Sequence, residues 1–230
     1  MPALYVISTP IGNLEDISLR ALRLLREVKL IAAEDTRTTR RLLTAYDIKT
    51  PLTSYHEHSN RAKLDYLLDY LETEDLALVS EAGMPGLSDP GYELIVSAIE
   101  RGISVVPVPG ASAVITALVV SGLPTDQFVY VGFLPRRKGQ RQRLLNSIAE
   151  ERRTIVAFET RHRLTEVLNE IEEILGDRRL CVCRELTKVH EEIFRGRVSQ
   201  AREHFAEPRG EFSLVIEGKT RAWLKFQERS

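Results

Sequence analysis

The sequence predicts an α/β protein built from two domains. Short apolar runs alternate with amphipathic helical patterns through the first half of the chain, which is typical of a parallel sheet covered by helices on both faces. A length of 230 residues is long for one domain and short for three, and the 43% apolar content is ordinary for a globular protein. Because Ser121-Gly-Leu-Pro124 interrupts the pattern, we predict an N-terminal domain over residues 1–120 and a C-terminal domain over residues 121–230.

The elements of the first half follow from their periodicity. The helix predicted at 17–25 carries an apolar stripe, and Asp16 is its candidate N-cap. The β-branched run at 103–108 is stopped by prolines, as expected at the end of a strand. The other predicted strands are 4–8, 29–33 and 76–80, and the other predicted helices are 40–45, 62–71, 92–99 and 111–120.

The second half repeats the same two kinds of pattern. Apolar runs predict strands at 128–131, 154–158, 180–184 and 212–217. Helical spacing predicts helices at 140–148 and 164–175, whereas residues 188–198 carry mixed signals.

Composition excludes several classes of protein. No run of about 18 apolar residues exists, so a membrane-spanning helix is not predicted, and the N-terminus lacks the pattern of a signal peptide. Cys181 and Cys183 are the only cysteines; they alternate onto one face of a strand and cannot easily bridge each other. This cysteine usage predicts a cytoplasmic protein. The net charge is −1, yet residues 135–149 hold five cations and no acid, which fits either a nucleic-acid contact or a solvated helix face.

Three loops rich in Gly, Pro and small polar residues follow predicted strands, at 8–13, 81–91 and 107–113. Ligands of open α/β sheets lie beyond the carboxyl ends of the strands, and glycine lets the backbone approach a ligand closely. We therefore predict a ligand cleft there, against the alternative of three ordinary turns. The chain lacks a phosphate-binding P-loop, a dinucleotide fingerprint and a G-x-S-x-G elbow. His56 and His58 are interpreted as part of a polar loop and the two cysteines as core packing, so no metal site is predicted.

Eight sequence blocks, in order along nearly the whole chain, resemble the tetrapyrrole methylase superfamily, and within it the family of methyltransferases that modify small-subunit ribosomal RNA. The blocks begin with Leu4-Tyr-Val-Ile-Ser-Thr-Pro-Ile-Gly-Asn-Leu-Glu-Asp-Ile-Ser18 and Ala33-Glu-Asp-Thr-Arg37. They continue with Ser54-Tyr-His-Glu-His58, Ser88-Asp-Pro-Gly91, Val108-Pro-Gly110, Gly132-Phe-Leu-Pro135, Arg184-Glu-Leu-Thr-Lys188 and Gly210-Glu-Phe-Ser-Leu-Val215.

The resemblance implies a fold of two α/β domains, with a parallel sheet in the first, a mixed sheet in the second and the cofactor in a cleft between them. It implies methylation of a cytidine ribose 2'-hydroxyl in the decoding region of 16S rRNA, with S-adenosylmethionine as the donor, by a homodimer that needs no metal. The implied cofactor-binding residues lie in the same three loops: Pro10, Gly12, Asn13, Ala82, Gly83, Ser88, Asp89, Gly110, Ala111 and Ser112. Two positions depart from the usual motifs, Met84 in place of threonine and Arg161 in place of proline.

Methyl transfer to a ribose hydroxyl needs alignment with the donor and a group that favours loss of the hydroxyl proton. The candidate catalytic residues are Lys188, Glu185 and Glu159, with Lys188 as a base or as a cation beside the developing alkoxide. The alternative for Lys188 and Glu185 is a structural ion-pair cluster.

The RNA contacts are predicted at the cations of residues 135–149, which are Arg136, Arg137, Lys138, Arg141 and Arg143. Two other functions stay open from the sequence: methylation of a small tetrapyrrole-like metabolite, and nucleotide binding without catalysis. The basic run favours RNA over a porphyrinoid.

Overall fold

The computed structural model describes residues 2–220 of the chain. The chain divides into two compact units, residues 1–112 and residues 113–230. The sequence predicts this boundary at 120/121 instead, and the two boundaries differ by helix α5 (Ala113–Val120). Helix α5 belongs to the second unit, because it contacts strands β7 (Thr154–Thr160) and β10 (Glu211–Ile216) of that unit. Residues 221–230, which the predicted C-terminal domain includes, lie outside the described residues.

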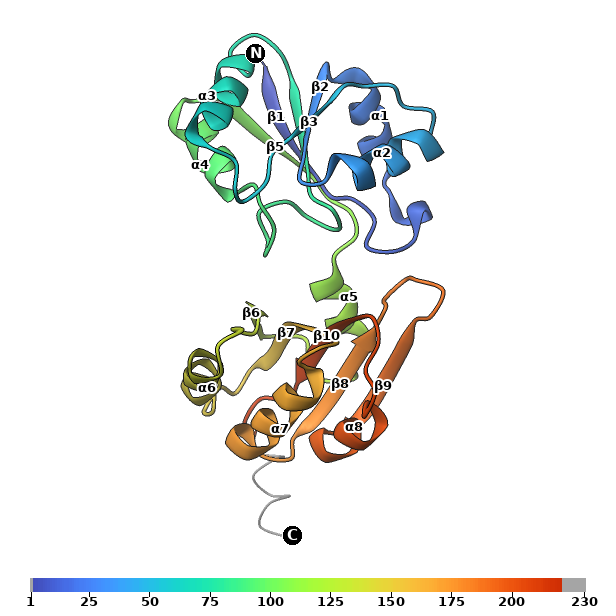
Figure 1. Cartoon of the computed structure of the whole chain (residues 1–230), viewed down its shortest axis with the longest axis vertical. Helices are drawn as coiled ribbons and strands as arrows, with labels where there is room; N and C mark the ends of the chain where they lie inside the picture. The colour runs from blue at the N-terminus through green and yellow to red at the C-terminus, as the bar shows by residue number, and fades with distance from the viewer. Residues whose placement is uncertain (1, 221–230) are drawn as a thin grey trace. The chain divides into compact units, whose positions relative to one another are not determined.

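The first unit is built on a five-stranded sheet in the order β3-β2-β4-β1-β5, and every neighbouring pair is parallel. All five strands therefore end at one edge of the sheet, where their connecting loops gather (Figure 1). The strands are β1 (Ala3–Ile7), β2 (Leu30–Ala33), β3 (Leu52–Ser54), β4 (Leu76–Val79) and β5 (Ser104–Val108).

Helices cover both faces of this sheet, because side chains of successive strand residues point to opposite faces. Tyr5 and Ile7 pack with helices α1 and α2, whereas Leu4 and Val6 pack with α3 and α4. Figure 1 shows the two helix pairs on opposite sides of the sheet. The helices are α1 (Leu19–Glu27), α2 (Thr36–Ala45), α3 (Arg61–Tyr70) and α4 (Tyr92–Glu100). The buried strands confirm the predicted parallel α/β layer.

The second unit contains a mixed five-stranded sheet in the order β6-β7-β10-β8-β9. Only β6 and β7 are parallel, and the other neighbours are antiparallel. One face carries the apolar core under the helices α6, α7 and α8, and α5 contacts β7 and β10. The remaining elements are β6 (Phe128–Phe133), β8 (Arg179–Arg184), β9 (Glu192–Arg197), α6 (Lys138–Ser147), α7 (Leu164–Leu175) and α8 (Val198–His204).

Three local features differ from the sequence prediction. Asp16 lies in a short 3-10 turn, and the N-cap of α1 is Ser18, whose hydroxyl accepts a hydrogen bond from the Ala21 amide at 3.1 Å. Strand β3 was not predicted, because it has only three residues, Leu-Thr-Ser, and no apolar run marks it. Two of the three residues are half-buried. Helix α8 follows β9 directly, which explains the mixed signals of 188–198.

Within residues 2–220, no helix is long and apolar enough to span a membrane. The same part of the chain holds no group of three His, Cys, Asp or Glu side chains arranged to bind a metal ion.

Candidate functional site

The three predicted loops follow three adjacent strands of the first unit. Strand β1 lies between β4 and β5, and all three run parallel. The loops that follow β1, β4 and β5 therefore emerge side by side at the carboxyl edge of the sheet, which is where open α/β sheets bind ligands. The structure thus brings the ten predicted cofactor-binding residues to one edge of one unit.

Backbone and hydroxyl hydrogen bonds fasten these loops to one another. Thr9 and Gly83 exchange two backbone hydrogen bonds, of 2.9 and 3.0 Å, which join the β1 and β4 loops. Ser8 donates its hydroxyl to the carbonyl of Ala111 at 2.6 Å, which joins the β1 and β5 loops. Ser8, Thr9 and Ser80 are all buried. Sequence reasoning missed these three residues, although a Ser or Thr directly after a buried strand is a usable signal.

The predicted cofactor-binding residues differ in exposure. Gly83 is buried and has a positive φ of 80°, so it shapes the loop. Asn13 is exposed, but its side chain already accepts a hydrogen bond from the Glu15 amide at 3.1 Å. The other exposed members are Gly12, Ala82, Ser88 and Gly110, and the partly buried ones are Pro10, Asp89, Ala111 and Ser112.

Three carboxylates lie beside the β4 loop. Glu34, directly after β2, accepts a hydrogen bond from the Glu81 amide at 3.1 Å. Burial and the nearby charge of Glu34 raise the pKa of Asp89 to about 7. The charge of Glu81 also raises this pKa, whereas a hydrogen bond with Ser80 lowers it. Sequence reasoning missed Glu34 as a site residue, even though it stands in one of the family blocks. The edge of the sheet is therefore acidic.

These residues fit S-adenosylmethionine. The loops at 8–13, 80–91 and 109–112 contain no Lys or Arg, so they are poorly suited to a phosphate ligand. S-adenosylmethionine carries a sulfonium and an ammonium, and the acidic edge suits both cations. Exposed glycine and alanine backbone in the same loops can meet the hydroxyl and amide-like groups of a nucleoside.

The second unit places Lys188 between two carboxylates. Its Nζ lies 3.2 Å from Oε1 of Glu185 and 2.8 Å from Oε2 of Glu211. Burial disfavours the charged ammonium, but the two ion pairs outweigh burial and raise the pKa of Lys188 above its ordinary value. Lys188 is consequently a cation, and the structure offers no support for Lys188 as a base of depressed pKa.

The loop that carries Lys188 has a tightly constrained backbone. Glu185 and Thr187 adopt positive φ angles of 51° and 65°, which are uncommon for residues with a side chain. A Cβ atom on Gly210 would lie 2.6 Å from Cγ of Glu185, so only glycine fits there. The Glu185 side chain is thus held between the Lys188 ammonium and the Gly210–Glu211 backbone.

The prediction that Glu159 reaches the reacting ribose is wrong, because its side chain is fully buried. Its Oε1 lies 2.6 Å from Nη2 of Arg163 and accepts a hydrogen bond from the Thr160 amide at 2.7 Å. The side chain has 0% exposure and stands on the same face of β7 as the core residues Ile155 and Ala157. Burial raises its pKa despite the ion pair with Arg163. Glu159 therefore supports the start of α7.

The prediction that Arg141 binds RNA is also wrong. Its side chain is 1% exposed, and its guanidinium pairs with Glu170 at 2.6 Å and with Glu166 at 2.7 Å. The helical period explains the difference, since Arg141 occupies the core-facing side of α6. The exposed cations of the segment are Arg136, Arg137, Lys138 and Arg143.

Comparison with known proteins identifies the family. The family model of the tetrapyrrole (corrin/porphyrin) methylases matches residues 3–202. The chain belongs to this family. Among curated relatives, it is 51% identical to "Ribosomal RNA small subunit methyltransferase I" of Halalkalibacterium halodurans over 94% of this chain and 75% of the relative. It is 50% identical to the protein of that name from Thermotoga maritima, over 95% of this chain and 100% of the relative.

Solved structures agree on the fold of this methylase. A uroporphyrin-III-C-methyltransferase from Thermus thermophilus matches with a TM-score of 0.66 at 20% identity, over 94% of each chain. A diphthine synthase matches with a TM-score of 0.71 at 12% identity, over 98% of this chain and 93% of that structure. The tetrapyrrole-methylase-like fold is confirmed. The family and the relatives make this methylase an S-adenosylmethionine-dependent methyltransferase.

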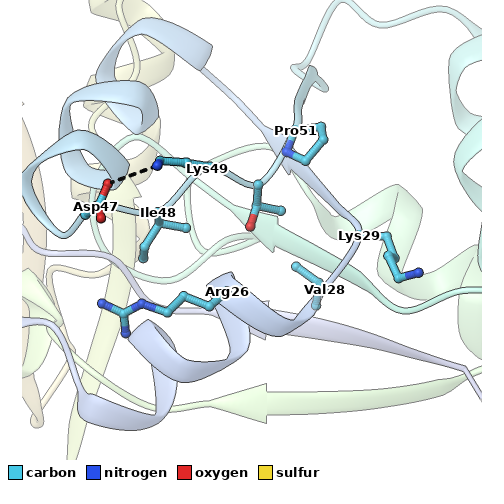
Figure 2. Close-up of a pocket in the computed structure, with 8 residues that line it drawn as sticks. Arg26, Val28, Lys29, Asp47, Ile48, Lys49 and Pro51 are labelled. Carbon is cyan, nitrogen blue, oxygen red and sulfur yellow. Dashed lines mark ion pairs between the residues drawn. The ribbon is translucent and has the colours of Figure 1, made fainter.

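The methylase also has an open hollow of about 490 Å³ in the first unit, which lies at the other edge of the sheet (Figure 2). Lys29 and Pro51 line it, and they precede the first residues of β2 and β3. Asp47 and Lys49, which also line it, form an exposed ion pair of 3.9 Å. Because it lies at the amino ends of the strands, this hollow is separate from the three loops.

Proposed function

We propose that this methylase transfers a methyl group to the ribose 2'-hydroxyl of a cytidine in the decoding region of 16S rRNA. The observation that carries the proposal is the shared name of the curated relatives. Proteins 43–51% identical over nearly the whole chain are called ribosomal RNA small subunit methyltransferase I. The exposed cations of residues 136–143 support an RNA substrate, because phosphate contacts require Lys and Arg.

The loops of the first unit would hold the donor. When bound, S-adenosylmethionine supplies a methyl group on a positively charged sulfur that is open to in-line attack. The backbone of Gly12, Ala82 and Gly110 would contact the nucleoside part, and the acidic edge formed by Glu34 and Asp89 would favour its positive charge. The hydrogen bonds of Ser8 and Thr9 keep the three loops in register for this task.

Lys188 would act on the acceptor. A ribose hydroxyl is a weak nucleophile at neutral pH, and a cation beside it lowers its pKa and stabilises the developing alkoxide. Lys188 suits this role because its ion pairs keep it charged. Glu185 would orient the ammonium, since it contacts both Nζ of Lys188 and the amide of Glu211 at 2.8 Å.

Labelled methyl transfer tests the proposal. Purified small ribosomal subunits that lack the modification should accept label from S-adenosylmethionine, and a porphyrinoid should not. Label in a tetrapyrrole but not in subunits would instead show the small-molecule alternative. The homodimer, the cytoplasmic location and the cofactor cleft between the two domains stay predictions, and sedimentation of the purified protein tests the first.

A further inference from the structure

Two arginines hold the segment that carries the exposed cations. We call residues 134–138, between β6 and the first turn of α6, the basic loop. Arg163 donates from Nη1 to the carbonyl of Leu134 at 3.0 Å. Arg141 donates from Nη1 to the carbonyls of Pro135 and Arg136, both at 3.3 Å. Three successive carbonyls of the basic loop are therefore bound from inside the unit.

Each arginine is in turn anchored by a buried carboxylate. Arg141 makes two hydrogen bonds with Glu170, from Nε at 2.6 Å and from Nη2 at 3.0 Å. Arg163 pairs with Glu159 at 2.6 Å. The side chains of Glu170 and Glu159 are 5% and 0% exposed, so the carboxylates cannot follow the arginines into solvent. The basic loop is thus tied to α7 and to the end of β7.

Stability alone does not account for this arrangement. Burying an ion pair removes two charges from water, and apolar side chains of similar size are often as stabilising. Loop carbonyls are ordinarily satisfied by water at the surface. A guanidinium, however, has five donors in a rigid fork, so one group can bind a carboxylate and loop carbonyls together. Two such groups fix the path of the basic loop.

We propose that Arg141 and Arg163 are positioning residues for RNA binding, which hold the basic loop so that Arg136, Arg137 and Lys138 are ordered before they meet phosphates. The inference rests on the proposed function. It assigns Arg141 a role without contact to RNA, and it gives Glu159 a role through Arg163. Flexible side chains and loops lose entropy when a complex forms, and this loss weakens binding. A basic loop that is already ordered in the free protein loses less entropy, so its affinity is higher.

Hydrogen exchange of the free protein tests the first half of the proposal. Arg141→Lys and Arg163→Lys each keep the charge but lose the fork. The amide of Leu134 donates to Phe158, and the amides of Gln140 and Arg141 donate to Arg137. These amides should exchange about tenfold faster or more in both variants.

Arg178→Lys is the matched control. Arg178 is as buried as Arg141, each being 1% exposed, and it donates to the carbonyls of Leu175, Ala149 and Glu217, away from the basic loop. Wild-type exchange around residues 134–141 in both test variants would overturn the proposal. If Arg141→Lys does not fold, Glu166→Gln removes one ion pair of Arg141 from a carboxylate that is 55% exposed.

Binding to small subunits at several salt concentrations tests the second half. If Arg141 and Arg163 are positioning residues, Arg141→Lys and Arg163→Lys should each weaken binding about tenfold. The salt dependence should stay unchanged, because the same phosphates are contacted once the complex forms. Faster exchange with wild-type affinity would overturn the proposal, as would a flatter salt dependence in the Arg141 variant. If wild-type protein itself does not bind subunits, the proposed function fails, and the exchange experiment still reports on the loop.

Discussion

A Cβ atom placed on Gly110 would lie 3.1 Å from Cβ of Ser8 and 3.4 Å from its hydroxyl oxygen. The same hydroxyl donates to the carbonyl of Ala111 at 2.6 Å. Gly110 therefore allows the β5 loop to lie against the β1 loop. The sequence predicts a glycine here for the close approach of a ligand, and the contact of Gly110 with Ser8 is an additional reason inside the protein.

Substitution of Gly110 should weaken donor binding by separating the two loops. A valine there must displace Ser8, so we expect Gly110→Val to lower the affinity for S-adenosylmethionine by tenfold or more. Gly139→Ala is the control, because a Cβ at Gly139 meets nothing within 4 Å. Calorimetric titration measures both. A folded Gly110→Val protein with wild-type affinity would show that these loops do not hold the donor.

The raised pKa of Asp89 predicts how stability changes with pH. The pKa is about 7 in the folded protein and about 4 in an unfolded chain, so the folded state holds the proton more tightly. This contribution to stability is fully present below about pH 4 and is lost as the pH rises toward 7. Asp89→Asn should match wild type near pH 4 and be more stable near pH 8, by less than the ~4 kcal/mol of the full shift because solvent screens a partly exposed carboxylate. Denaturant unfolding at both pH values decides this.

Donor binding should also depend on Asp89. A cationic ligand beside the carboxylate favours its ionised form, so binding near pH 7 should release a proton. The affinity for S-adenosylmethionine should then rise between about pH 6 and pH 8, and Asp89→Asn should remove most of that rise. Calorimetry in buffers of different ionisation enthalpy counts the released protons. Equal pH dependence in the two proteins would remove Asp89 from the donor site.

Lys188 should affect the chemical step and not donor binding. We expect Lys188→Ala to slow methyl transfer by about 10²-fold or more at saturating substrates, with the donor affinity unchanged. Lys188→Arg should recover part of the rate because it keeps the charge near Glu185 and Glu211. If the cluster is only structural, the melting temperature should fall and the rate per folded molecule should stay normal.

The exposed cations of the basic loop should control the salt dependence of subunit binding. Changing Arg136, Arg137 and Lys138 together to alanine should reduce the slope of log affinity against log salt concentration by about 2. Each phosphate contact on a single strand contributes about 0.7 to that slope. Donor affinity should not change. The control removes an equal charge from exposed Arg20, Arg40 and Arg41 on α1 and α2. Equal effects from the two triple variants would mean that net charge alone governs binding.

Periodicity predicted most of the fold because burial dictates it. The apolar runs of β1 and β4 and the leucines of α3 had to face a core, and they do. Strand β3 was not predicted because it is a three-residue edge strand that pairs, among the described strands, only with β2, with two residues half-buried and one exposed.

The site was predictable in its backbone and not in its charges. Loop composition and the order of strands placed the ligand site at the carboxyl edge of the sheet. This prediction needs no knowledge of side-chain contacts. Arg141 and Arg143 are two residues apart and look alike in sequence, yet one is buried against Glu170 and the other is exposed. Which of two neighbouring cations turns inward depends on acids some 30 residues away, and no local pattern records that pairing.

Position-resolved methyl transfer tests the central claim most directly. Small subunits that lack the modification would be incubated with the purified protein and labelled S-adenosylmethionine, and their rRNA would then be hydrolysed in alkali. A 2'-O-methyl group blocks cleavage of the adjacent phosphodiester, so we predict one labelled, alkali-stable dinucleotide that begins with cytidine and maps to the decoding region. Label that returns as a single nucleotide, or that appears on a base, would contradict the proposed reaction.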